Sequence, residues 1–170
     1  LKLSMFENRE IDLKYEPLDM QSLINEVTSS MRLQFEKNNA VVNVSSDGQS
    51  YFEGDRLHMV SVIFNLLDNA LKYSHDNPHI NILTTSTANK LSLEISDDGI
   101  GIPEEYREKV FEKFFRVPTG NLHNAKGYGL GLSYVAQVVK KHRGTIRVES
   151  VEGGGSKFVI TLPKNQNEQS

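Results

Sequence analysis

The chain has 170 residues, with 22 acidic against 19 basic side chains, a net charge of -3 and no cysteine. This length is enough for one domain with a proper core. The absence of a basic excess gives no reason to expect a nucleic-acid partner. The lack of cysteine excludes disulfides and thiolate metal sites. No apolar run approaches the roughly 20 residues that span a bilayer, so we expect no direct membrane contact.

The first part of the chain predicts short elements around one helix. Residues 11–17 alternate apolar and charged side chains and predict a strand that Pro17 stops. Asp19 is the expected cap of a helix whose apolar spacing continues to Phe35. Residues 38–48 and 50–55 predict two strands around a turn at Asp47-Gly48.

The segment from Leu57 to Tyr73 is predicted to be a long helix capped by Asp55. Its apolar residues recur at three- and four-residue spacing and fill a broad face. What remains is a narrow polar stripe that consists of Ser61, Asn65, Asp68, Asn69 and Lys72. Such a stripe, taken by itself, simply faces water. The alternative is that the stripe binds a ligand. Motifs elsewhere in the chain are needed to distinguish these two interpretations.

The second half of the chain predicts more strands than helices. Residues 79–87 and 90–96 alternate apolar and polar side chains, which indicates antiparallel strands with one buried face. The remaining expected elements are a short helix at 104–115, a long loop at 117–128, a helix at 130–144 stopped by Gly144, closing strands at 145–151 and 156–163, and a disordered tail. This order predicts an α+β sandwich with helices on one face of a mixed or mainly antiparallel sheet.

The motif "SDDGIGIP" follows the strand at 90–96 directly. Gly99 and Gly101 allow a sharp turn and a close approach of the backbone. A carboxylate fixed at a strand end, at Asp97 or Asp98, can accept a hydrogen bond from a ligand amine such as that of adenine. The alternative interpretation is a plain Asp-Gly turn.

The motif "KGYGLGL" places Gly127, Gly129 and Gly131 at the start of a helix. Free N–H groups there form an anion site, although neither a Walker loop nor the dinucleotide fingerprint is present. A flexible hinge is the alternative. The preceding "FEKFFR" carries phenylalanines and an arginine, and core packing is the favoured interpretation of its Phe111. The stretch 153–158 is also compatible with an ordinary hairpin turn.

Together these elements give the polar stripe a function. Asparagine oxygens are neutral hard ligands, which suit a Mg²⁺ ion whose charge is met by phosphates. Asn65 and Asn69 are four residues apart and point to one side of the helix. Lys72 lies on the same stripe and can meet phosphate oxygens, and Tyr73 lies at its edge.

The set of motifs resembles the ATP-binding catalytic domain of bacterial sensor histidine kinases, within the GHKL ATPase superfamily. "NLLDNALKYS" resembles the N box of this family, "DDGIGIP" its G1 box, "FEKFFR" its F box, "GYGLGL" its G2 box and "GGGSKF" its last glycine box. All five follow the family order, and as a set they are specific. The resemblance implies the Bergerat-type fold, a two-layer sandwich of a mixed sheet of about five strands on three helices.

The resemblance implies roles for the N-box residues. Asn69 would ligate Mg²⁺, and Asn65 would line the same site. Lys72 would contact phosphates, and Tyr73 would lie along the nucleotide.

For the G1 box and the last box, the resemblance implies an adenine pocket. Asp97 would accept the adenine amine, with Gly99 and Gly101 shaping the pocket around it. Ser156 stands where the family has Thr or Ser near the adenine. Ile102 is expected in the same pocket.

The phosphates would be met by the F and G2 boxes. Arg116 would reach them, and Gly127, Gly129 and Gly131 would let a lid and a helix start close over them. The remaining residues that we expect in this part of the nucleotide site are Lys126, Leu130 and Leu132, the first of them from its charge and position.

The resemblance also implies what lies outside the chain. Residues 1–17 resemble the end of a dimerisation helix and a connector, 18–163 the ATP-binding domain, and 164–170 a tail. The chain begins without Met, so we expect a piece of a longer protein. We expect that protein to be a homodimer anchored in the membrane by another segment, with this domain in the cytoplasm. None of its five histidines has the context of the family's phosphoacceptor. The partners would be the dimerisation domain and a response regulator.

Two other functions stay open at this point. Other GHKL ATPases hydrolyse ATP with a glutamate base beside the N-box asparagine, whereas Asn65 stands four residues before Asn69 here. A non-catalytic nucleotide sensor is the third possibility.

Overall fold

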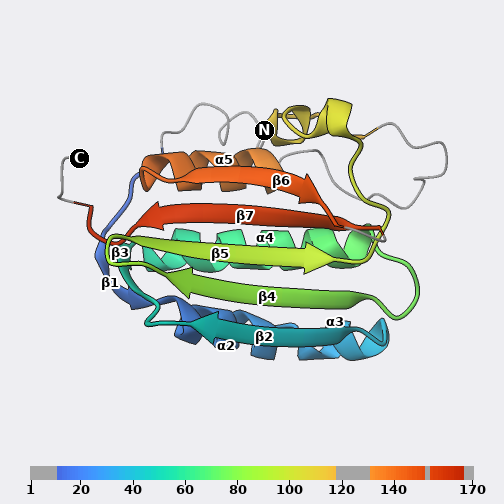
Figure 1. Ribbon diagram of the computed structural model, residues 1–170, viewed down its shortest axis with the longest axis horizontal. Helices are drawn as coiled ribbons and strands as arrows, with labels where there is room; N and C mark the ends of the chain where they lie inside the picture. The colour runs from blue at the N-terminus through green and yellow to red at the C-terminus, as the bar shows by residue number, and fades with distance from the viewer. Residues whose placement is uncertain (1–10, 118–130, 152–153, 167–170) are drawn as a thin grey trace.

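A five-stranded mixed sheet forms one layer of the computed structural model, which describes residues 11–117, 131–151 and 154–166. The strand order is β2-β4-β5-β7-β6, with β2 parallel to β4 and every other neighbouring pair antiparallel (Figure 1). The strands are β2 (Val41–Asp47), β4 (His79–Ser86), β5 (Lys90–Asp97), β6 (Thr145–Ser150) and β7 (Ser156–Pro163).

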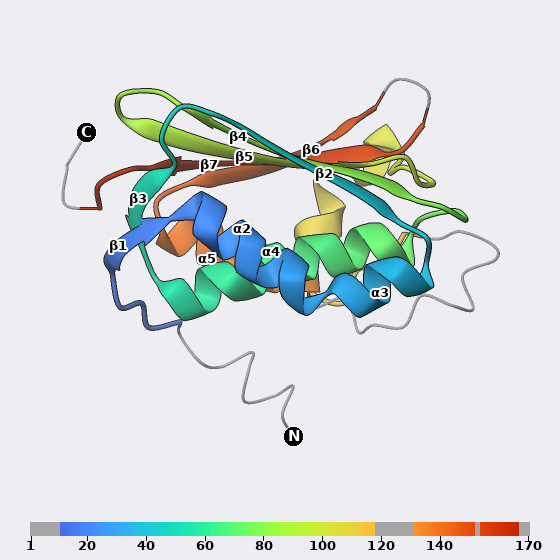
Figure 2. The ribbon, with the colours of Figure 1, turned by 90° about the horizontal axis from the view of Figure 1, so that it is seen from below.

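Helices form the second layer and cover one face of this sheet (Figure 2). They are α2 (Met20–Ser30), the short α3 (Arg32–Lys37), α4 (Arg56–Lys72) and α5 (Gly131–Lys141). The core lies between the layers, because β4 and β5 direct alternate side chains such as Ile82 and Leu93 toward buried residues of α4 such as Ile63. The two-layer α+β prediction is confirmed.

The predicted helix starts are confirmed by their caps. The Asp19 side chain accepts a hydrogen bond from the Gln21 N–H at 3.2 Å, and Asp55 accepts one from the His58 N–H at 2.9 Å. The helix predicted to run on to Phe35 is interrupted, since Met31 leaves helical geometry between α2 and α3. No helix in the described ranges is long and apolar enough to cross a membrane.

The N-terminal strand predictions need correction. The strand β1 (Glu16–Asp19) contains Pro17 instead of ending there, and residues 11–15 are not part of a strand. Proline is tolerated because β1 pairs only with β3 (Tyr51–Gly54) in a separate two-stranded sheet. The two strands expected around Asp47-Gly48 exist, but they do not pair with each other, since β2 joins the large sheet.

The predicted helix at 104–115 is wrong. Two short 3₁₀ turns, η1 (Glu104–Tyr106) and η2 (Lys109–Phe111), take its place. Phe114 then has a φ of +65°, which no helix tolerates and which redirects the chain toward Phe115.

The ends of α5 and of the domain also differ from expectation. The residue with left-handed backbone geometry after α5 is Arg143, with a φ of +63°. Glycine is needed at position 144 for a different reason, because a Cβ there would lie 2.4 Å from the Thr161 carbonyl oxygen. The expected disordered tail is wrong for residues 164–166. Gln166 is buried and donates a hydrogen bond to the His142 carbonyl at 2.6 Å.

Candidate functional site

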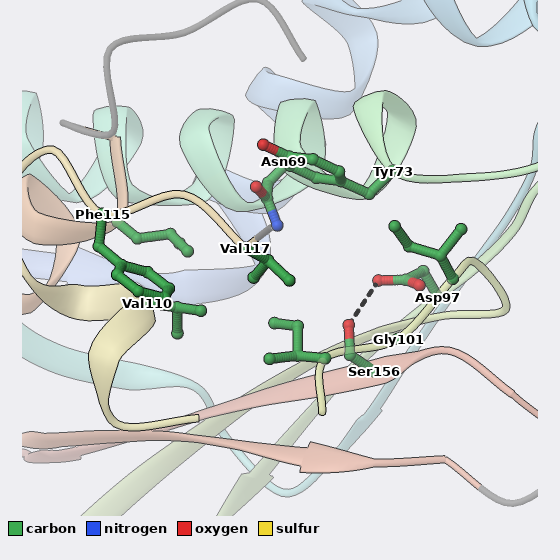
Figure 3. Close-up of a pocket in the computed structure, with 11 residues that line it drawn as sticks. Asn69, Tyr73, Asp97, Gly101, Val110, Phe115, Val117 and Ser156 are labelled. Carbon is green, nitrogen blue, oxygen red and sulfur yellow. Dashed lines mark hydrogen bonds between the residues drawn. The ribbon is translucent and has the colours of Figure 1, made fainter. Parts of the chain in front are cut away.

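A cavity with about 540 Å³ of empty space, partly open to solvent, lies between the end of α4 and the sheet (Figure 3). It is bounded by the end of β5, the start of β7, the η2 region and the start of α5. The residues that line it are Asn69, Tyr73, Asp97, Ile100, Gly101, Ile102, Val110, Phe115, Val117, Leu132 and Ser156. Seven of these belong to the predicted site.

Asp97 is the charged group on the sheet side of this cavity. Its Oδ1 accepts a hydrogen bond from the Gly99 N–H at 2.9 Å, and its Oδ2 accepts one from the Ser156 hydroxyl at 3.1 Å. Burial raises the pKa of Asp97, although the hydrogen bonds from Gly99 and Ser156 oppose this shift. A carboxylate accepts about four hydrogen bonds, so Asp97 retains capacity for a donor in the cavity.

Glycines bring the neighbouring backbone segments together around Asp97. A Cβ on Gly155 would lie 2.0 Å from the Asp97 carbonyl oxygen, and one on Gly99 would lie 2.3 Å from the Tyr73 carbonyl oxygen. The same Tyr73 carbonyl accepts the Ile100 N–H at 3.1 Å. The first glycine motif therefore meets the end of α4 and the last glycine motif meets the end of β5, both through backbone contacts that side chains would prevent.

Asp98 has a different environment from its neighbour. Its carboxylate accepts the His79 N–H at 2.9 Å and lies 3.1 Å from the His79 ring Nδ1. The hydrogen bond from the His79 backbone is the main reason why the pKa of Asp98 is lowered. Asp98 thus joins the end of β5 to the start of β4, while Asp97 faces the cavity.

The α4 side of the cavity presents Asn69 and Tyr73, one helical turn apart. Figure 3 shows both side chains projecting from the helix, across the cavity from Asp97 and Ser156. Asn65 and Lys72 do not line the cavity. The Asn65 amide donates to the Ser61 carbonyl at 2.7 Å, and the Lys72 ammonium lies 2.9 Å from the Asp68 carboxylate.

A Mg²⁺ ion would find few protein ligands in this region. No group of three histidine, cysteine, aspartate or glutamate side chains within the described ranges is able to hold a metal. Asn69 supplies one neutral oxygen donor at the cavity. This donor set fits a hard cation that phosphate oxygens mainly hold.

Several predicted residues lie elsewhere. Gly99 shapes the turn behind the cavity, and Gly131 begins α5, where an added Cβ would lie 3.1 Å from the Asn65 Oδ1. Arg116 interacts with another group of the chain but does not line the cavity. Four further predicted residues lie outside the described residues, namely Lys126, Gly127, Gly129 and Leu130. The expected lid at 117–128 also lies outside them, apart from Val117.

The sequence did not predict the apolar residues of the cavity wall. Ile100, Val110 and Val117 line the cavity without having been assigned to it, and Phe115 joins them. Their position next to the G1 and F motifs is the available signal, because aliphatic side chains carry no chemical signature of their own. Phe111 packs edge-to-face on core Phe158 at 6.1 Å, as the core interpretation predicts.

The arrangement suits a flat, largely apolar ring that bears an amine. Asp97 would accept the hydrogen bond of that amine, and the aliphatic and aromatic walls would cover the faces of the ring. The amide of Asn69 then lies on the helix side, where a polar extension of such a ligand is able to leave the cavity.

Comparison with known proteins agrees with this geometry. The family model "Histidine kinase-, DNA gyrase B-, and HSP90-like ATPase" matches residues 54–166. Sensor protein RprX of Bacteroides fragilis is 42% identical over 172 aligned residues, which cover 99% of this chain and 33% of that protein. Sensor histidine kinase WalK of Bacillus subtilis is 29% identical over 171, covering 99% and 28%. The chain therefore spans about a third or less of the length of these relatives.

Solved structures show the same fold. The nucleotide-free catalytic domain of histidine kinase ThkA matches with a TM-score of 0.80 and 29% identity, over 90% of this chain and 99% of that one. ThkA in complex with response regulator protein TrrA matches with a TM-score of 0.84 and 25% identity, over 99% and 47%. The chain belongs to the histidine kinase-, DNA gyrase B- and HSP90-like ATPase family, and it is an ATP-binding catalytic domain of the sensor histidine kinase type.

Proposed function

We propose that this chain binds ATP with Mg²⁺ in the described cavity and transfers the γ-phosphoryl group to a histidine on an upstream dimerisation domain of its parent protein. The parent would be a membrane-anchored homodimer in a two-component system, with this domain in the cytoplasm. A response regulator would then take the phosphoryl group. The similarity to ThkA, which has been solved in complex with a response regulator, supports this assignment.

The observation that carries the proposal is the buried carboxylate of Asp97 in an otherwise largely apolar cavity. Its hydrogen bonds to Gly99 and Ser156 hold it in place and leave acceptor capacity for the exocyclic amine of adenine. Gly101, with a φ of +76°, brings the G1 backbone to the edge of the ring.

The phosphate end of the nucleotide would lie toward α4 and the start of α5. Asn69 would supply its amide oxygen to Mg²⁺, with Asn65 beside it. When bound with ATP, the ion neutralises charge on the transferred phosphoryl group. Lys72 and Arg116 would add positive charge next to the phosphates. Gly131 at the start of α5, together with Lys126, Gly127 and Gly129 outside the described residues, would complete this end.

The environment of Asn65 favours phosphoryl transfer over hydrolysis. An amide cannot act as a general base, and the Asn65 Nδ2 is already committed to the Ser61 carbonyl. The related ATPases would need a glutamate near this position. The nucleophile that attacks the γ-phosphate would then come from another domain.

The histidines of the chain support the same conclusion. His142 is fully buried with both ring nitrogens in hydrogen bonds. The ring of His58 contacts the Tyr134 hydroxyl, and the ring of His79 contacts Asp98. His75 is exposed, and His123 lies outside the described residues. An acceptor on another domain fits this arrangement best.

The test is a transfer assay with γ-labelled ATP and Mg²⁺, with and without a separate histidine-bearing dimerisation domain. The chain alone should not label itself. It should label the added domain slowly, because the tether is lost, and the product should be labile in acid and stable in alkali. Rapid hydrolysis without acceptor would favour an ATPase, and binding without transfer would favour a nucleotide sensor.

A further inference from the structure

His142 is a fully buried histidine just after α5 and does not line the nucleotide cavity. Its Nδ1 lies 2.8 Å from the Val138 carbonyl oxygen, so this nitrogen must carry the proton. Its Nε2 therefore has a free lone pair and accepts the Asp55 N–H at 3.0 Å. The ring joins the end of α5 to the residue that caps α4.

Asp55 in turn holds the N-terminal segment of the chain. One carboxylate oxygen caps α4 through the His58 N–H, and the other accepts the Lys14 N–H at 2.7 Å. The next residue, Tyr15, donates its hydroxyl to the Lys141 carbonyl at 3.2 Å, and its ring meets His142 edge-on at 5.9 Å. We call Lys14, Tyr15, Asp55 and His142 the connector clamp.

The connector clamp and the cavity lie at opposite ends of the same two helices. Asp55 precedes α4, whose other end carries Asn69 and Tyr73. His142 follows α5, whose other end carries Leu132. The two helices are in contact, and they run antiparallel because the end of α5 meets the start of α4 at His142 and Asp55 while the start of α5 lies near Asn65. Helix α4 alone spans roughly 25 Å at 1.5 Å per residue. The clamp thus fixes the direction in which residues 11–15 leave a unit that also holds the nucleotide.

We propose that His142 is a positioning residue for phosphoryl transfer, which fixes Asp55 and thereby the exit of the connector, so that the bound nucleotide faces an acceptor on the upstream domain. This inference rests on the proposed function. His142 touches neither the cavity nor any reacting atom. Its effect is confined to the placement of one domain relative to another, and placement errors of about 1 Å are enough to slow such a step up to a hundredfold.

The test compares tethered with untethered transfer. In the full-length parent protein, His142→Leu should lower the transfer rate about tenfold at unchanged KM for ATP, because the Asp55 N–H loses its acceptor and the clamp loosens. In the isolated chain with a separate dimerisation domain, the same change should alter the rate less than about twofold. His142→Gln, whose side-chain oxygen replaces Nε2 as acceptor, should restore most of the tethered rate.

Val138→Ala is the matched control. Its side chain is fully buried one helical turn before His142 and takes no part in the clamp. It should lower stability without changing the ratio of tethered to untethered rates. Equal losses in both assays for His142→Leu, or no loss in the tethered one, would overturn the proposal.

Amide hydrogen exchange at Lys14 provides a second readout that does not depend on activity. This N–H is bonded to Asp55, so its exchange should accelerate about tenfold in His142→Leu and in Asp55→Asn, and less in His142→Gln. Unchanged exchange would overturn the clamp. If the wild-type parent transferred no phosphoryl group, the proposed function would fail, while the exchange experiment would still decide whether His142 holds the connector.

Discussion

The sheet side of the cavity and the polar stripe of α4 differ in how their polar groups are held. Asp97 is fixed by groups from other segments, namely the Gly99 N–H and the Ser156 hydroxyl. On α4, Asn65 and Lys72 are bonded to residues of their own helix, four positions away. The proposed adenine acceptor on the sheet side is therefore already held in place, whereas Asn65 and Lys72 would have to leave their local partners to contact phosphates. We expect adenine contacts to dominate affinity and the stripe to act mainly on transfer.

The largest effect should come from Asn69→Ala. We expect phosphoryl transfer with Mg²⁺ to fall at least about a hundredfold, because the amide oxygen that would hold the ion is lost. Nucleotide affinity should fall far less, since Asp97 and the apolar walls remain. Rapid-quench transfer assays and calorimetry would measure the two quantities.

Asn65→Ala on the same helix is the control for Asn69→Ala, because the Asn65 side chain does not line the cavity. It should cost less in transfer than Asn69→Ala does. Near-normal transfer by Asn69→Ala would mean that Asn69 is only a surface amide.

Asp97→Asn should weaken the binding of ADP and of adenosine alike, by roughly ten- to hundredfold. The reason is the loss of a charged acceptor worth about 1.5–3 kcal/mol. The substituted amide can still accept from Gly99 and donate to Ser156, so the pocket should keep its shape. Calorimetry with adenosine isolates this contact from the phosphates, and an unchanged affinity would exclude the adenine role.

Asp98→Asn is the matched control, since Asp98 faces His79 instead of the cavity. It removes the same charge from the neighbouring position. Adenosine affinity should change less than about twofold, because the Asp98 carboxylate contacts exposed His79 and not the cavity.

The raised pKa of Asp97 adds a pH dependence with a definite sign. Burial disfavours the ionised form, so the stability that this group contributes is complete below its ordinary value of 3.8 and is lost as the pH rises through the folded value. Asp97→Asn removes that loss, and the nucleotide-free variant should be at least as stable as the wild type at neutral pH. Thermal unfolding over a pH series that starts below 3.8 would show whether the stability difference between the two proteins grows as the pH rises.

The backbone contacts of the sheet side make a prediction about stability. Gly155→Ala should cost about 2 kcal/mol or more, because a Cβ would lie 2.0 Å from the Asp97 carbonyl and the residue has a φ of +96°. Gly154→Ala carries the same kind of strain, with a φ of +115°, but has only a distant neighbour at 3.8 Å. Urea unfolding should therefore rank the two, and equal losses would mean that strain, not contact, decides.

The sequence predicted the elements whose signals are local. The Asp19 and Asp55 caps and the alternation in β4 and β5 act within a few residues, and the structure has them as expected. The pairing of β2 with β4 depends on residues 38 positions apart, so a turn signal at Asp47-Gly48 could not reveal it.

The same distinction applies to the cavity. Polar residues at motif positions, such as Asn69 and Asp97, could be assigned to the site from the sequence, because an amide or a carboxylate there suits only a few functions. Ile100, Val110 and Val117 became wall residues only through tertiary packing. The left-handed turn at Phe114 that leads to Phe115 also had no local signal, since phenylalanine rarely adopts it.

Lys72→Met should have the smallest effect, and it tests directly whether the polar stripe of α4 acts separately from the sheet side of the cavity. The Lys72–Asp68 pair is partly exposed and spans one helical turn, so its loss should change stability by only about 0.3–0.5 kcal/mol. ADP affinity should fall about two- to fivefold, since an ammonium that must leave Asp68 contributes little net energy to phosphate binding. Adenosine affinity should not change.

Lys37→Met is the control, because it removes the same charge at the end of α3 and should affect neither ligand. The ADP difference should shrink as salt rises, and a loss of adenosine binding in Lys72→Met would contradict the separation of the sheet side from the stripe.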